Sequence, residues 1–139
     1  MVNMYKTILV PIDMGNAVEG KANINLAAQH AADGAKIILL NVVEEIPTWA
    51  AAQLPANIIE DSFEAVRTEM KAIANASGMK LDVEVRAGHS YNTILDVAKE
   101  KNVDLIIIAS HSPGLQDYFL GSTAAKVVRH ANCSVLVVR

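Results

Sequence analysis

Five short runs of apolar residues recur along the chain, and the stretches between them carry apolar positions at helical spacing. Four of the five runs are dense in Ile, Val and Leu, which is typical of strands covered on both faces. The third run alternates apolar and polar residues, so one of its faces is expected to meet solvent at a sheet edge. The runs occupy residues 8–12, 37–43, 81–85, 105–109 and 135–138.

Four helices are predicted between these strands. Each begins near a small polar residue that can accept a hydrogen bond from the first free N–H groups. Two of them end near a glycine, as helices commonly do. The expected limits are Asn16 and Gly34 for the first helix, Asp61 and Gly78 for the second, Ser90 for the start of the third, and Ser122 for the start of the fourth.

The strict alternation of strands and helices predicts the fold class. A βαβαβαβαβ order favours a mostly parallel sheet with helices on both faces, in one doubly wound α/β domain spanning residues 1–139. Ligands of such domains bind at the carboxyl ends of the strands, where the strand order reverses. Residues 44–60 form the longest connection and carry Trp49. We expect a functional role for that loop, because long loops in compact domains are seldom idle.

Composition limits the classes of partner. The chain is 52% hydrophobic and 19% charged, with fifteen acidic and twelve basic residues for a net charge of −3. Without a cluster of Lys or Arg, nucleic acid is a poor ligand. No apolar run is long enough to span a membrane, and Pro11 and Asp13 interrupt the N-terminal apolar segment, so secretion is not expected. The lone Cys133 fits a reducing compartment, and we expect a cytoplasmic protein.

The strongest candidate chemistry lies between the fourth strand and the last helix. The apolar run ends at Ala109, a polar loop follows, and Gly121 stands before the helix. Backbone N–H groups in such a loop and at a helix start can hold a phosphate without any basic side chain. An ordinary Pro-Gly turn and a plain Ser122 cap are the structural alternative. The residues concerned are Ser110, His111, Ser112, Gly114, Gly121, Ser122 and Thr123.

Two further residues follow predicted strands. Asp13 ends the first strand, where its carboxylate can bind a ribose or a metal ion, or can cap the next helix, and its position leaves these roles equally open. Gly88 follows the third strand and either turns the chain or allows a ligand to approach the backbone. The residues do not point to catalysis, because the histidines are dispersed and both a Gly-x-Ser-x-Gly elbow and a Walker lysine are absent from the sequence. His111 is the only loop candidate for a base, and metal-ligand spacing is lacking.

The segment 104–139 also resembles the C-terminal signature of the universal stress protein family. ATP-binding members carry Gly-x2-Gly, nine residues, then Gly-Ser or Gly-Thr. Here Ala109 and Ser112 take the two glycine positions, eight residues separate Ser112 from Gly121, and Gly121-Ser122 is intact. The F-type proteins of enteric bacteria share this pattern of Ala-Ser-His, a variable residue and Pro, then Leu-Gly-Ser. The chain is most similar to that subgroup.

The resemblance implies a Rossmann-like fold of the adenine nucleotide alpha hydrolase kind, with strand order 3-2-1-4-5. It implies a regulatory, stress-response module that binds ATP, ADP or AMP, with Mg²⁺ held mainly by the phosphates, and that forms a homodimer through the C-terminal strand. An interaction protein of the same fold without nucleotide and a slow ATPase stay open as alternatives. The site residues that it implies are Pro11, Ile12, Asp13, Val42, Gly88, Ala109, Ser110, His111, Ser112, Gly121, Ser122 and Thr123.

Overall fold

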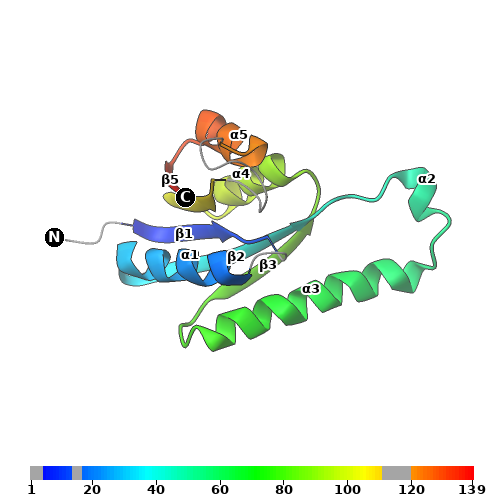
Figure 1. The fold of residues 1–139 in the computed structure, drawn as a ribbon, viewed down its shortest axis with the longest axis horizontal. Coiled ribbons are helices and arrows are strands. Elements are labelled where there is room, and N and C mark those ends of the chain that lie inside the picture. Colours follow the sequence, from blue (N-terminus) through cyan, green and yellow to red (C-terminus); the bar gives the residue numbers. More distant parts are fainter. Residues whose placement is uncertain (1–4, 14–16, 111–119) are drawn as a thin grey trace.

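A computed structural model describes residues 5–13, 17–110 and 120–139, which form one sheet between two layers of helices (Figure 1). The strands are β1 (Tyr5–Pro11), β2 (Ala31–Val43), β3 (Asp82–Ala87), β4 (Leu105–Ala109) and β5 (Ser134–Val138). The helices are α1 (Ala17–His30), α2 (Thr48–Ala51), α3 (Ala56–Ala76), α4 (Ser90–Glu100) and α5 (Ser122–His130).

The sheet is parallel throughout and has the strand order β3-β2-β1-β4-β5. The predicted doubly wound fold and its strand order are therefore confirmed. The order reverses between β1 and β4, which are neighbours in the sheet with Ile8 opposite Leu105. β3 lies at an edge, as its alternating pattern predicted, and β5 forms the opposite edge.

Each face of the sheet has its own apolar core. On one face, Ile8 and Val10 pack in a cluster with Ile24 of α1 and Met70 of α3. On the other face, Leu9 belongs to a cluster that also contains residues of α4 and α5, with Val97 and Val127 both fully buried. Burial on both faces explains why the central strands are almost continuously apolar.

The predicted end of the first helix at Gly34 is wrong. α1 ends at His30, and Gly34 lies inside the irregular first half of β2 with a φ of +73°. The register of β1 and β2 shifts there, because Tyr5 pairs with Ala31 whereas Thr7 pairs with Lys36. The glycine thus serves a bulge in a strand, where the extra residues need a positive φ, rather than a helix terminus.

The connection 44–60 is not one long loop, and the predicted helix start at Asp61 is wrong. α2 occupies part of the connection, and α3 begins at Ala56 with Pro55 as its N-cap residue. Proline suits a helix entrance because its φ is already fixed near the helical value. Asp61 consequently lies inside α3. The predicted end near Gly78 is confirmed, since α3 stops at Ala76 and Gly78 has a φ of +72°.

The helix start at Ser90 is confirmed, but Ser90 is not the cap. His89 occupies the N-cap position, no side chain caps the helix, and the His89 carbonyl accepts a hydrogen bond from the Thr93 N–H at 3.0 Å. His89 adopts an extended conformation, which lets the chain turn directly from β3 into α4.

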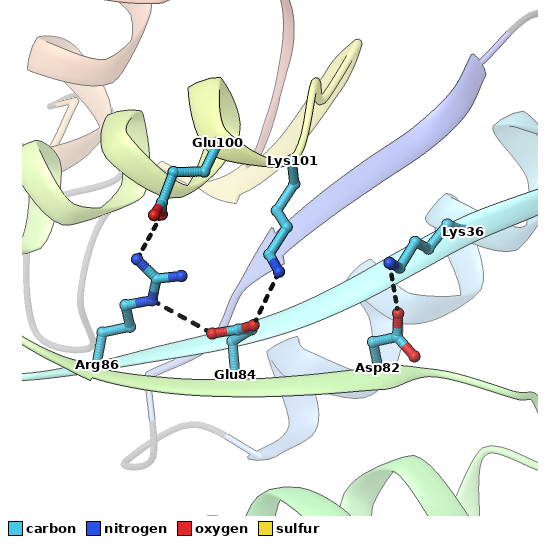
Figure 2. A network of polar contacts seen from close by, with 6 residues as sticks. All are labelled: Lys36, Asp82, Glu84, Arg86, Glu100 and Lys101. Atoms are coloured by element: carbon cyan, nitrogen blue, oxygen red, sulfur yellow. Dashed lines mark hydrogen bonds and ion pairs between the residues drawn. The ribbon is translucent and has the colours of Figure 1, made fainter.

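A chain of ion pairs joins the edge strand β3 to the end of α4 (Figure 2). Arg86 pairs with Glu100 and, from Nε at 3.2 Å, with Glu84. The Nζ of Lys101 lies 3.4 Å from the second carboxylate oxygen of Glu84. The hydrogen bond that Arg86 donates to Glu100, with support from the one to Glu84, raises the pKa of Arg86 above its ordinary value. Partly exposed pairs stabilise little one by one, but this network fixes the polar face of β3 against α4.

Candidate functional site at the carboxyl edge of the sheet

The first part of the candidate site is the end of β1. The Ile12 N–H donates to the carbonyl of Leu40 at 2.8 Å, and the Ile12 carbonyl accepts the side-chain amide of Asn41 at 2.8 Å. Ile12 is buried, whereas Asp13 is exposed at the same edge. β2 therefore holds the residue that follows β1 in place, and the Asp13 side chain next to it is accessible. This accessibility is compatible with ligand binding.

The second part is the junction of β4 with α5. Ser110 is buried, its N–H donates to the carbonyl of Val138 at 2.8 Å, and its carbonyl accepts the Gly121 N–H at 2.5 Å. The Ser110–Gly121 bond closes the loop between them, so that α5 begins beside the end of β4. Its consequence is that a helix N-terminus lies at the switch point of the sheet.

The start of α5 is suited to an anion. Gly121 is the N-cap residue, and no side chain caps the helix there. The alternative in which Ser122 is the cap is therefore wrong, because Ser122 is the first residue inside the helix. A helix N-terminus carries partial positive charge and directs N–H groups outward, which favours a bound anion by about 0.3–1 kcal/mol at an exposed site.

The third part is the turn after β3. Gly88 donates its N–H to the Val43 carbonyl at 3.0 Å and has a φ of +149°. A Cβ placed on Gly88 would lie 2.5 Å from Oγ1 of Thr93, which is buried on α4. The turn therefore requires a glycine for its own geometry. Val42 is half-buried in β2, next to Val43. The family resemblance implies that the backbone of Val42 contacts the adenine edge.

The structure brings most of the predicted residues to one edge of the sheet and leaves three undescribed. Pro11 to Asp13, Val42, Gly88, Ala109 and Ser110 lie at or beside strand ends, Gly121 is the N-cap residue of α5, and Ser122 and Thr123 begin that helix. His111, Ser112 and Gly114 lie outside the described residues. Sequence reasoning missed Asn41 and Thr93, whose side chains hold the β1 end and meet the Gly88 turn. An asparagine within an otherwise apolar strand run was the available signal for Asn41.

The charge of this edge restricts what it can do. The segments that form it, residues 11–13, 42–44, 87–89, 109–110 and 120–123, contain no Lys or Arg. An anion bound there would have to be held by backbone N–H groups and the dipole of α5 rather than by cationic side chains. Among the described residues, no three His, Cys, Asp or Glu side chains are grouped to hold a metal ion.

Within the described part of the chain, none of the helices is both long and apolar enough to cross a bilayer. The fold and the site together define a small doubly wound α/β domain with an anion-suited helix end at its switch point. The chain belongs to the universal stress protein family, whose sequence profile matches residues 4–139. Recognition of the family from the sequence is thus confirmed.

Individual relatives match over nearly the whole chain. A universal stress protein of Methanocaldococcus jannaschii is 30% identical, over 99% of this chain and 84% of its own. Universal stress protein G of Escherichia coli is 28% identical, over 98% of this chain and all of its own. The solved protein UspA from Lactobacillus plantarum is 29% identical with a TM-score of 0.72, over 97% of this chain and 98% of its own.

Two more distant relatives have solved structures in complex with nucleotides. One universal stress protein, in complex with cAMP, is 22% identical with a TM-score of 0.65. A universal stress protein from Archaeoglobus fulgidus, in complex with dAMP, is 17% identical with a TM-score of 0.61. At these identities the likeness to this chain is one of fold.

Proposed function

We propose that this chain is an adenine nucleotide-binding module, with ATP as its ligand, that acts in regulation or sensing rather than in turnover. The observation that carries the proposal is the convergence of the β1 and β4 ends with the N-terminus of α5, closed by the Gly121–Ser110 hydrogen bond. This is where doubly wound domains bind ligands, and a helix start is a ready site for phosphate.

Each strand end has a role in this proposal. Pro11 and Ile12 pack beside the adenosine, Asp13 accepts hydrogen bonds from the ribose hydroxyls, and the backbone of Val42 reads the adenine edge. The phosphates lie toward Gly88, residues 109–112 and the α5 start at residues 121–123, with Mg²⁺ held mainly by the phosphates. The complexes of two relatives with cAMP and dAMP support the proposal, because the shared fold accommodates an adenine nucleotide in those proteins.

The alternative from another class is an interaction protein that has lost the nucleotide. Ala109 and Ser112 favour it, because they stand where ATP-binding members carry glycines. Side chains there restrict the backbone and narrow the space for phosphates. Denaturing the purified protein and identifying any released nucleotide by its ultraviolet spectrum and mass separates the two. Release of an adenine nucleotide supports binding; nucleotide-free protein that also fails to take up added ATP supports the alternative.

Hydrolysis is expected to be slow. Without a Walker lysine in the sequence, turnover should fall well below the ~1–100 s⁻¹ of kinases, and bound ATP should in part survive purification. Turnover in that range, abolished by His111→Ala, would instead identify an enzyme. The cytoplasm as its location stays a proposal that rests on the lone Cys133.

A further inference from the structure

Residues 44–66, here called the arm, stand apart from the body of the domain. The arm comprises α2 and the first half of α3, and Figure 1 shows both extending beyond the end of the sheet. No residue of α2 is buried, and the buried residues of α3, Met70 and Ala74, both lie beyond the arm. Val66, the last residue of the arm, packs against the core on one face of the sheet. The packing of the sheet does not account for the large exposed apolar side chains of the arm.

The large exposed apolar side chains of the described residues lie in two parts of the chain, the arm and the segment that begins just before α5. Of the six large ones, four belong to the arm and two flank or lie on α5. Trp49 is 73% exposed, and it is the single tryptophan of the chain. Single exposed apolar residues are normal, but four large ones on a single protruding segment are more than the fold requires and favour an interaction site. The arm residues are Ile46, Trp49, Leu54 and Ile58, and the other two are Leu120 and Val128.

The arm is strongly acidic. It contains Glu44, Glu45, Glu60, Asp61 and Glu64 and no Lys, Arg or His. Glu64 pairs with Arg67, whereas the other four carboxylates form no ion pair with any described residue. Two arms laid against each other would bring these charges together, and like charges at close range repel. The arm consequently fits a partner surface that is apolar and cationic.

The outer face of α5 has that character. α5 contains Lys126, Arg129 and His130 and no acidic residue, and Val128, next to Arg129 in the sequence, is 47% exposed. The Nζ of Lys126 lies 4.7 Å from the centre of the Tyr91 ring. Arg129 is exposed and forms no ion pair within the described residues. The His130 ring also stacks on Tyr91, with ring centroids 6.5 Å apart. Arg129 is therefore the cation of this helix that is most available to a partner, and it adjoins the exposed Val128.

We propose that the arm docks on the outer face of α5 of a second copy of this chain. The arm and α5 are complementary in charge, and each carries exposed apolar area that the contact would cover. They do not meet within one copy, since α3 covers the sheet face opposite to α5 and α2 lies well away from it (Figure 1). A two-fold axis can satisfy both contacts at once, arm to α5 in each direction.

Trp49 reports this contact directly in the full-length protein. As concentration rises through the micromolar range at low ionic strength, its emission should shift to shorter wavelength and acrylamide should quench it less. Added salt should reverse both changes, because the screening length falls to about 3 Å at 1 M. A contact between two acidic arms would instead strengthen with salt. A dimer that forms elsewhere would leave Trp49 unchanged.

Charge reversal supplies the matched test. Arg129→Glu should weaken self-association about tenfold in sedimentation velocity, while Lys99→Glu, the same charge change at an exposed site on α4, should not. Combining Arg129→Glu with Glu60→Arg should restore part of the association. Trp49 emission independent of concentration would overturn the proposal. So would a concentration-dependent change in Trp49 emission that Arg129→Glu leaves unaltered or that salt strengthens. The proposal would also be overturned if the protein bound an amphipathic peptide of Leu and Lys but did not associate with itself.

Discussion

The side-chain amide of Asn41 donates to the main-chain carbonyl of Ile12 across 2.8 Å, at the point where β1 ends. Asn41 is only 7% exposed, and the Ile12 N–H is bound in turn by the carbonyl of Leu40. Both main-chain polar groups of Ile12 are therefore held by β2. The direction in which the chain leaves β1 toward Asp13 depends on this pairing, so Asn41 is a positioning residue for the candidate site.

Asn41→Leu should destabilise the protein by about 1–3 kcal/mol, because the buried Ile12 carbonyl would lose its partner. The free energy of unfolding in urea measures the effect. Asn25→Leu, the same substitution at an exposed position of α1, should change it far less. Equal stability of the two variants would show that the Asn41–Ile12 bond contributes nothing.

Gly88→Ala tests the turn after β3. A φ of +149° is strained for alanine and costs about 1–3 kcal/mol, and the added Cβ would also approach Oγ1 of Thr93. Gly34 has a φ of +73°, but a Cβ added there would have no atom within 4 Å. Gly34→Ala should therefore cost only the backbone strain. Adding Thr93→Ala should recover part of the Gly88→Ala loss in urea unfolding. A double variant no more stable than Gly88→Ala would refute the contact.

The thiol of Cys133 should react slowly with alkylating reagents at neutral pH. Partial burial, and after it the negative charge of Asp104, raises the pKa of Cys133 above its ordinary value. Its alkylation by iodoacetamide should therefore be slower than that of a small free thiol at neutral pH and should accelerate only at higher pH. The pKa of the Cys133 thiol is higher in the folded protein than in the unfolded chain. Its contribution to the free energy of unfolding is therefore fully present at a pH below the unfolded pKa, and it is lost as the pH rises through the folded pKa. Cys133→Ser should flatten that alkaline dependence; a thiol as reactive as a free one at neutral pH would contradict the account.

We propose a homodimer through β5. Within the part of the chain that the structure describes, this strand pairs only with β4. Its residues from Val135 to Val138 are half-exposed and uncharged, so the edge lacks the usual protection against pairing. Val137→Lys should shift the protein toward monomer in light scattering at high salt, where the proposed arm–α5 contact is screened. Val85→Lys, a half-buried position on the opposite edge strand, is the control and should leave the dimer intact. A monomer for the unmodified chain at micromolar concentration would refute this proposal.

The strands were predictable because burial on two faces leaves a strong pattern in the sequence. The runs at residues 37–43 and 105–109 fall within β2 and β4, and the alternation after Leu81 correctly placed β3 at an edge. The turn elements were less predictable. α2 has only four residues, too few for any helical spacing, and Gly34 looked like a helix end because a glycine with positive φ serves a bulge equally well.

Hydrogen bonds between side chains and distant parts of the chain could not be predicted from the sequence. Asn41 acts on Ile12, which is 29 positions away, and only the pairing of β1 with β2 brings them together. The same holds for Asp104, whose two carboxylate oxygens accept the N–H groups of Lys6 and Thr7 at 2.9 Å each and so fix the start of β1 beside β4. Such contacts follow from topology and register, which local pattern does not contain.

Calorimetric titration with ATP tests the central claim most directly. The unmodified protein should bind ATP at one site, and Gly121→Val should abolish the binding. Gly121 has a φ of −61°, which valine tolerates, so the substitution blocks approach to the α5 N-terminus without straining the backbone. Ala72→Val, at an exposed position of α3, should bind as the unmodified protein does. Absence of heat from the unmodified protein with ATP, ADP and AMP, or unchanged affinity in Gly121→Val, would contradict the assignment.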